Sequence, residues 1–159
     1  MLFRSHTLDI SLPAESLLVN ADPVRLMQVI GNLLANAAKY TEMNGRIRLF
    51  AEREGNDVVL HIKDTGIGIA SEMLSRIFDL FVQVDQAAER SQGGLGIGLT
   101  LVRNLVEMHN GLVTAKSEGI GKGSEFLIRL PIAADHENPV SAVCTQPISS
   151  AHESCHRHQ

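Results

Sequence analysis

The chain has 159 residues and a net charge of −4, and its composition of 44% hydrophobic and 20% charged residues is typical of one globular domain. This charge excludes a broad basic surface for nucleic acid, and 4% aromatic residues without tryptophan argue against a base-stacking platform. No apolar run is long enough to predict a membrane span, so we expect no direct membrane contact. Two cysteines near the end imply no disulfide framework and fit a reducing, cytoplasmic setting.

The first half of the chain predicts a strand, a helix and a hairpin. Residues 3–10 alternate loosely, which indicates a strand. Asp22 followed by Pro23 predicts a helix start, because aspartate is a preferred N-cap and proline suits the first helical position. Apolar residues then recur at helical spacing to about Tyr40, and the expected inward positions are Leu26, Ile30, Leu33, Leu34 and Ala37.

The remaining elements follow a turn at Gly55-Asn56. Residues 46–53 and 57–63 alternate on either side of it and predict an antiparallel hairpin. Beyond the hairpin we expect a short helix over 71–77, a mobile loop over 84–95, a helix over 98–108 and strands over 112–117 and 124–130. The sum is an α+β fold, a two-layer α/β sandwich whose mixed, mostly antiparallel sheet is covered on one face by helices.

The domain is expected to occupy residues 1–132. Residues 133–159 are rich in His, Ser and Pro and show no periodicity, so they predict a disordered linker or tail.

A carboxylate followed by two glycines ends the second hairpin strand. Asp64 offers two acceptor oxygens at a strand end. Gly66 and Gly68 permit backbone angles closed to other residues, and they let a ligand approach the main chain. A second glycine cluster, residues 93–98, leads into the helix over 98–108, where free backbone N–H groups favour phosphate. We therefore expect the two turns to hold opposite ends of ATP, although the second cluster alone is also compatible with a flexible hinge.

A polar stripe runs along the helix over 22–40. Asn32, Asn36 and Lys39 share one face, because steps of three and four residues bring side chains together. Arg25 and Gln28 extend the same stripe. Such a stripe is commonly just a solvated face. An amide oxygen is also a good Mg²⁺ ligand beside phosphate, and a lysine one turn on neutralises phosphate charge.

The familiar nucleotide motifs are absent from the sequence. There is no Gly-x-x-x-x-Gly-Lys-Ser/Thr loop, and Gly66-x-Gly68 lacks the third glycine of a dinucleotide fingerprint. The His-Arg-Asp loop of Ser/Thr/Tyr kinases is missing as well.

Several short motifs occur instead in one fixed order. They are NLLANAAKYT (32–41), DTGIG (64–68), FDLF (78–81), GLGIGL (94–99) and GKGSEF (121–126). Each is weak alone, but the series over residues 3–131 resembles the catalytic ATP-binding domain of bacterial sensor histidine kinases. The resemblance implies the Bergerat-type fold of the gyrase, heat-shock chaperone, histidine kinase and MutL superfamily.

The resemblance also implies roles for individual residues. Asn36 would ligate a Mg²⁺ that bridges the phosphates, with help from Asn32. Lys39 would contact phosphate, and Asn36 and Lys39 would be the catalytic residues. Asp64 would accept a hydrogen bond from the adenine amino group. Residues 84–95 would form a lid over ATP, with Phe78 and Phe81 at its base or simply in the core. The implied nucleotide contacts are completed by Tyr40, Gly66, Gly68, Ile69, Gly94, Leu95, Gly96, Ile97, Gly98, Leu99 and Ser124.

Asn32 stands where hydrolytic relatives in this superfamily carry a glutamate that activates water. An amide cannot accept the proton, so fast ATP hydrolysis is not expected. The implied nucleophile is a histidine of a dimerisation domain, within a His-Glu-x-x-Thr-Pro-like motif that this sequence lacks. The chain alone is then monomeric and does not autophosphorylate. The parent kinase would be a homodimer, in some cases anchored in the inner membrane, and would pass phosphate to a response regulator receiver domain.

Other interpretations compete with this one. A regulatory module that only binds nucleotide, or an anti-sigma-factor-type serine kinase, would carry similar motifs. Asp64-Thr65-Gly66 is also the aspartic-protease triplet, but a protease of that type would be nearly all β. The tail residues His152, Cys155, His156 and His158 are possible metal ligands, but we expect only adventitious binding there.

Overall fold

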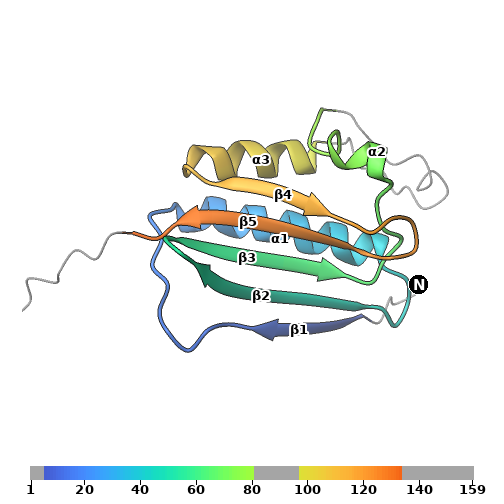
Figure 1. The fold of residues 1–159 in the computed structure, drawn as a ribbon, viewed down its shortest axis with the longest axis horizontal. Coiled ribbons are helices and arrows are strands. Elements are labelled where there is room, and N and C mark those ends of the chain that lie inside the picture. The colour runs from blue at the N-terminus through green and yellow to red at the C-terminus, as the bar shows by residue number, and fades with distance from the viewer. Residues whose placement is uncertain (1–5, 81–96, 134–159) are drawn as a thin grey trace, which may run out of the picture.

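The computed structural model describes residues 6–80 and 97–133. They form one mixed sheet of five strands in the order β1-β2-β3-β5-β4, with the two longer helices packed on one face of it (Figure 1). The elements in chain order are β1 (Thr7–Ser11), α1 (Pro23–Tyr40), β2 (Arg46–Glu54), β3 (Asp57–Asp64), α2 (Ser71–Leu74), α3 (Gly98–Met108), β4 (Leu112–Lys116) and β5 (Ser124–Pro131). The predicted α+β sandwich is therefore confirmed.

The sheet is antiparallel except at one edge. β2 and β3 form the predicted hairpin, in which Glu54 lies opposite Asp57, and β5 pairs antiparallel with both β3 and β4. β1 pairs parallel with β2, with Leu8 opposite Ile47. β1 also ends one residue beyond the range expected for it, and all of its residues are exposed, because it is the edge strand of the sheet.

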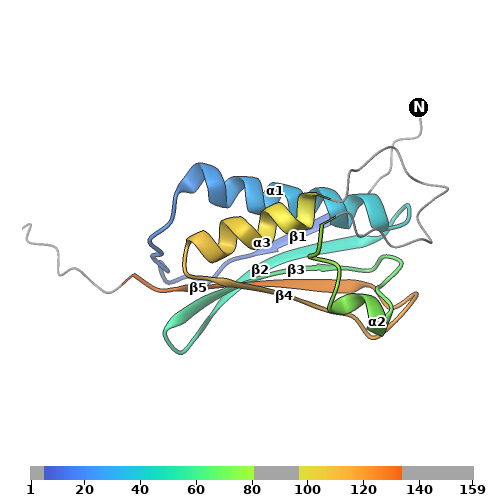
Figure 2. The ribbon, with the colours of Figure 1, turned by 90° about the horizontal axis from the view of Figure 1, so that it is seen from above.

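The helices α1 and α3 lie side by side over one face of the sheet (Figure 2). The core fills the space between them and that face. Its fully buried centre includes Leu33 of α1, Ile62 of β3, Val102 of α3 and Ile128 of β5. Neither α1 nor α3 covers the other face of the sheet (Figure 2). On that face Val59 and His61 are buried by their neighbours in the sheet, whereas Arg48 and Lys63 are exposed.

Helix α1 begins where the sequence predicts. The carboxylate of Asp22 accepts hydrogen bonds from the backbone N–H groups of Val24 and Arg25, at 2.8 and 3.2 Å, which satisfies donors that the first turn leaves free. The buried face is rotated slightly from the expected one. Val29 is buried, whereas Ile30 is only partly buried, because α1 packs against α3 as well as the sheet.

Helix α2 is shorter than the predicted 71–77. After Leu74 the chain continues in tighter turns, with the N–H of Asp79 donating to the carbonyl of Arg76. These turns direct the adjacent residues Ile77 and Phe78 into the core together, which one face of a regular helix does not do. β3 extends one residue further than expected and includes Asp64, and β4 stops one residue earlier, at Lys116.

Within residues 6–80 and 97–133, none of the helices combines the length and apolar character that crossing a membrane requires.

The His109 ring joins the end of α3 to the start of α1. Its Nδ1 donates to the carbonyl of Leu105 at 2.6 Å, and its Nε2 accepts from the N–H of Asp22 at 3.0 Å. We expect His109→Ala to lower the free energy of unfolding by about 1–2 kcal/mol, because two backbone groups, one of them partly buried, lose their partners. Urea unfolding measures this, with Asn104→Ala on the exposed side of α3 as the control. If both substitutions changed the free energy of unfolding equally and by nearly zero, the stabilising role of His109 would be contradicted.

Candidate functional site

Several chain segments that are distant in sequence meet at one end of the sandwich. The C-terminal end of α1, the end of β3, the start of β5 and the start of α3 all lie at the right-hand end of Figure 1. Each of the described motifs contributes residues to this end. The fold therefore brings together the chain segments in which the sequence predicted the candidate site residues.

Asp64 is the centre of this group. It is only 4% exposed although it carries a carboxyl group, and it faces the helical layer because it follows Ile62 by two residues on β3. Its Oδ1 accepts from the N–H of Gly66 at 2.7 Å, and its Oδ2 accepts from the hydroxyl of Ser124 at 2.5 Å. Each carboxylate oxygen can accept two hydrogen bonds, so both retain capacity for a ligand donor.

The glycine turn after Asp64 is fixed to the end of α1. The N–H of Ile67 donates to the carbonyl of Tyr40 at 3.0 Å. A Cβ atom at Gly66 would overlap that same carbonyl oxygen. The close approach at Gly66 is therefore between two stretches of protein backbone, which explains the glycine whether or not a ligand also approaches it.

A second turn, residues 119–123, locks against the first. The N–H groups of Gly121 and Gly123 donate to the carbonyls of Ile67 and Gly66, at 2.7 and 3.1 Å. Gly68 has a φ of +72°, and a Cβ there would overlap the carbonyl oxygen of Gly119. The sequence predicts that a ligand approaches the main chain at Gly66 and Gly68. The structure supplies a packing reason for both, and their contact with nucleotide stays a prediction.

Ser117 holds the two turns together, and the sequence analysis did not identify it. Its hydroxyl donates to the carbonyl of Gly123 at 2.7 Å and accepts from the N–H of Ile69 at 3.0 Å. A serine next to a run of glycines is a signal for hydroxyl-to-backbone bonding. The signal was present in the sequence but was too common to single out one residue.

The polar stripe of α1 is present as predicted. Asn32, Asn36 and Lys39 are all half-buried, whereas Arg25 and Gln28 at the other end of the stripe are exposed and bonded to each other at 3.3 Å. The half-buried residues of the stripe are therefore those nearer the C-terminal end of α1, which is the end that meets the Asp64 turn. The Nζ of Lys39 also lies 5.2 Å from the ring centroid of its neighbour, Tyr40.

The start of α3 faces the same end of the sandwich. Among the described residues, the N-cap Ile97 gives the first turn no side-chain hydrogen bond, and the backbone N–H groups of such a turn are donors that suit an anion. The hydroxyl of Thr100 donates to the carbonyl of Phe78 at 2.9 Å, which fixes the start of α3 to the segment before the lid motif. Phe78 itself is buried and packs edge-on against Phe126, so its core role is established.

Other predicted site residues divide into two groups. Ile69 is buried in the core, and Leu99 packs against the core while partly exposed. Both side chains therefore have structural roles, and nucleotide contacts through them stay predictions. The other group lies outside the described residues: Phe81, Gly94, Leu95, Gly96 and the predicted lid over 84–95.

One end of this α/β sandwich thus gathers a polar amide stripe on a helix, a buried carboxylate at a strand end and the start of a second helix. Such an arrangement is typical of an ATP-binding domain. Residues 21–134 match the family model of histidine kinase-, DNA gyrase B- and HSP90-like ATPases, and the chain belongs to that family. Within it, the chain is a catalytic ATP-binding domain of the sensor histidine kinase type.

Curated relatives support the narrower assignment. The chain is 40% identical over 124 residues to the circadian input-output histidine kinase CikA of Synechococcus elongatus, covering 78% of this chain and 16% of the relative. It is 42% identical over 110 residues to the sensor protein SrrB of Staphylococcus aureus, covering 69% and 19%. The chain thus spans less than a fifth of the length of these relatives.

Solved structures agree with the sequence matches. Full-length ShkA in complex with AMPPNP is 31% identical with a TM-score of 0.71, over 82% of this chain and 26% of that one. The catalytic domain of the histidine kinase ThkA, in a nucleotide-free form, is 26% identical with a TM-score of 0.69 and covers 81% and 82%. The second match is of domain against domain, which supports the fold assignment over nearly the whole of both chains.

Proposed function

We propose that this domain binds Mg²⁺–ATP and transfers the γ-phosphoryl group to a histidine on a separate dimerisation domain. The observation that carries the proposal is that the C-terminal half of α1, which carries Asn36 and Lys39, meets the end of β3 at Asp64 and the start of α3 at one end of the sandwich. The family membership and the AMPPNP complex of ShkA support nucleotide binding at this place.

Adenine selection rests on Asp64 and its hydroxyl partner. The Ser124 hydroxyl and the Gly66 N–H hold the carboxylate in one orientation through its two oxygens. An acceptor fixed in this way favours the amino group of adenine over the carbonyl oxygen that guanine presents at the equivalent position. Ser124 therefore orients Asp64 and acts on nucleotide indirectly.

The phosphate end of the site is formed by α1 and α3. Asn36 is the proposed Mg²⁺ ligand with Asn32 beside it, and both fit because an amide oxygen suits this ion when phosphate oxygens and water complete its coordination. When bound, Mg²⁺ supplies charge neutralisation to the phosphates. Lys39 adds positive charge beside them, and the first turn of α3 at Gly98 directs its N–H groups to the anion. The residues outside the described ranges, Gly94, Leu95 and Gly96, are proposed to wrap the triphosphate, with 84–95 as the lid.

The site favours transfer to a protein nucleophile over hydrolysis. Asn32 precedes Asn36 by one turn and has no proton-accepting group at neutral pH, so it does not activate water. Catalysis then consists of positioning and charge neutralisation, and the rate depends on the arriving histidine. We propose that the parent is a homodimer with its ATP site in the cytoplasm, and that a response regulator receiver domain accepts the phosphoryl group afterwards.

Phosphoryl transfer to an added acceptor tests the proposal. The chain is mixed with γ-labelled ATP, Mg²⁺ and a purified histidine-bearing dimerisation domain, and the label on each protein is followed. We expect acid-labile label on the acceptor domain and none on this chain. Label on serine of an added protein would instead favour an anti-sigma-factor-type kinase, and binding of ATP without any transfer would favour a regulatory module.

A further inference from the structure

A buried histidine lies on the sheet face that neither α1 nor α3 covers. His61 of β3 is 6% exposed, and its side chain points away from the helices because it alternates with the core residue Ile62. Its ring stacks on Phe50 of β2, with 4.3 Å between the ring centroids and 8° between the planes. This stacking fixes the orientation of both ring nitrogens. The ATP site lies on the other face of the same sheet, so His61 has no part in the proposed phosphoryl transfer.

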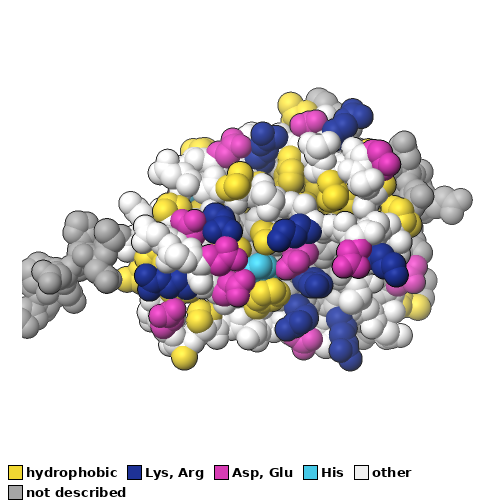
Figure 3. Space-filling model, in the orientation of Figure 1, with side chains coloured by type: hydrophobic (Ala, Val, Ile, Leu, Met, Phe, Trp, Pro, Cys, Tyr) yellow, Lys and Arg dark blue, Asp and Glu magenta, His cyan; other side chains and the backbone are white. Residues whose placement is uncertain are grey.

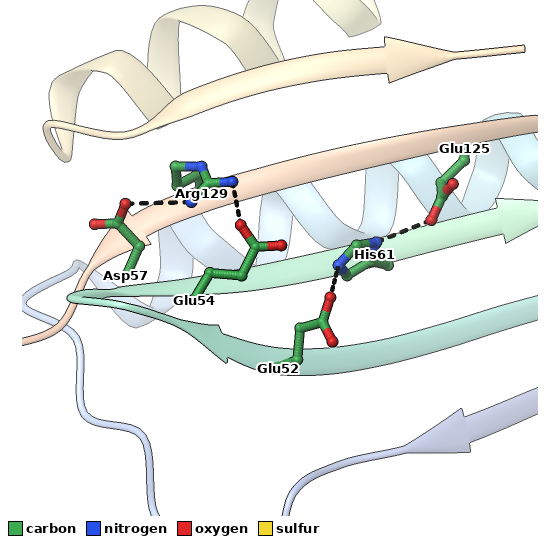
Figure 4. A network of polar contacts seen from close by, with 6 residues as sticks. All are labelled: Glu52, Glu54, Asp57, His61, Glu125 and Arg129. Carbon is green, nitrogen blue, oxygen red and sulfur yellow. Dashed lines mark hydrogen bonds and ion pairs between the residues drawn. The ribbon is translucent and has the colours of Figure 1, made fainter.

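Three carboxylates surround this ring (Figure 4). The Nδ1 atom of His61 lies 2.9 Å from Oε1 of Glu125 and forms a hydrogen bond with it. The Nε2 atom lies 3.1 Å from Oε1 of Glu52, but it is fully buried and makes no hydrogen bond of acceptable geometry. A buried ring nitrogen that points toward a carboxylate without a proper hydrogen bond needs another partner.

Glu54 adds another carboxylate close to the His61 ring. Ligand atoms of Glu52, Glu54 and His61 all lie within 4.8 Å of one another. In a tetrahedral site with metal–ligand bonds of about 2.0–2.2 Å, neighbouring ligand atoms are roughly 3.3–3.6 Å apart. The 3.1 Å between Nε2 of His61 and Oε1 of Glu52 is close to that spacing.

We propose that Nε2 of His61, Glu52 and Glu54 bind a divalent transition-metal ion of the Zn²⁺ type on the open face of the sheet. One imidazole and two carboxylates are ligands that such ions accept, and water completes the coordination from the solvent side. Glu125 has the position of an outer partner, because a ligating histidine usually donates its other ring N–H to a carboxylate.

The charges around this site determine how tightly it binds a metal ion. Arg129 of β5 bonds Oε2 of Glu54 at 2.5 Å and Oδ2 of Asp57 at 3.4 Å. The hydrogen bond from Arg129 lowers the pKa of Glu54, and the guanidinium charge beside it opposes a bound cation. Basic side chains are interspersed with acidic ones over this face (Figure 3), and Lys116 lies opposite Glu125 in the sheet. We therefore expect micromolar rather than structural-zinc affinity.

Zinc titration followed by NMR of the histidine rings tests this site directly. The full chain is used without nucleotide, and the histidines and cysteines of the tail are replaced so that they do not compete: His136→Ala, Cys144→Ser, His152→Ala, Cys155→Ser, His156→Ala and His158→Ala. Zinc should shift the ¹⁵N signal of Nε2 of His61 and leave the ring of His109 unchanged. An unmoved His61 ring at saturating zinc would overturn the proposal.

Variants of the exposed Glu52 and the partly buried Glu125 test the site without changing the buried histidine. Glu52→Gln should weaken zinc binding by at least about tenfold, and Glu125→Gln by about tenfold through the orientation of the ring. Glu107→Gln is the matched control, because Glu107 is an exposed glutamate paired with Arg103 on α3, away from this face. Zinc affinity that is equal in the Glu52 and Glu107 variants would show that the metal binds elsewhere, and the proposal would fail.

Discussion

Asp64→Asn is expected to weaken binding of a non-hydrolysable ATP analogue by about 10- to 100-fold. The substitution removes the charge of a buried acceptor, and hydrogen bonds to charged groups contribute about 1.5–3 kcal/mol. It also places an amide donor where one carboxylate oxygen now accepts from Gly66 or Ser124. Calorimetric titration of wild-type and variant chains measures the change.

Two variants define the origin of this loss. Asp57→Asn makes the same chemical change at the opposite end of β3, where the carboxylate pairs with Arg129, and should leave nucleotide affinity unchanged. Ser124→Ala removes only one donor to Asp64 and should cost less, about 3- to 10-fold. Binding by Asp64→Asn within about twofold of wild type would show that Asp64 does not contact the base.

Asn36→Ala is expected to abolish the strengthening of nucleotide binding by Mg²⁺. Without the amide oxygen the ion loses its protein ligand, and phosphoryl transfer to an added acceptor domain should fall by about 100-fold or more because the phosphates are no longer held in place. Titration with and without Mg²⁺ measures the first effect, and labelled ATP the second.

Gln28→Ala is the matched control for Asn36. Gln28 lies on the same stripe of α1, eight residues earlier and so about 12 Å along the helix axis. It should retain both the Mg²⁺ effect and the transfer rate. A Mg²⁺ effect that survives in Asn36→Ala would move the metal ligand to another residue, of which Asn32 is the nearest candidate.

Elements with strong local signals could be predicted from the sequence. The Asp22 cap and Pro23 fix the start of α1, and the turn at Gly55-Asn56 fixes the β2–β3 hairpin. Local signals do not specify which strands pair over long distances. The parallel pairing of β1 with β2, across the whole of α1, has no signature in either strand.

The candidate site was predictable in its polar side chains and not in its backbone contacts. Asp64 and the α1 stripe were identified because a carboxylate or a row of amides is visible in a sequence. The carbonyl of Tyr40, which accepts from Ile67, belongs to the main chain and could not be identified in this way. The Ser117 hydroxyl acts between two turns whose contact depends on the finished sheet.

The surroundings of His61 show which contacts can be predicted once the pairing of two strands is known. With a two-residue turn at Gly55-Asn56, counting back along the hairpin places Phe50 opposite His61, as the structure does. The contribution of Glu125 required β5 to pair with β3, which depends on a contact between residues 64 positions apart.

The measurement that tests the central claim most directly is calorimetric titration of the wild-type chain with non-hydrolysable analogues of ATP and GTP, each with and without Mg²⁺. We expect the ATP analogue to bind, to bind more tightly with Mg²⁺, and to be preferred over the GTP analogue by at least about tenfold, which corresponds to one well-placed hydrogen bond. Equal binding of the two analogues, or no binding by a folded chain, would contradict the assignment of Asp64, Asn36 and Lys39 to one nucleotide site.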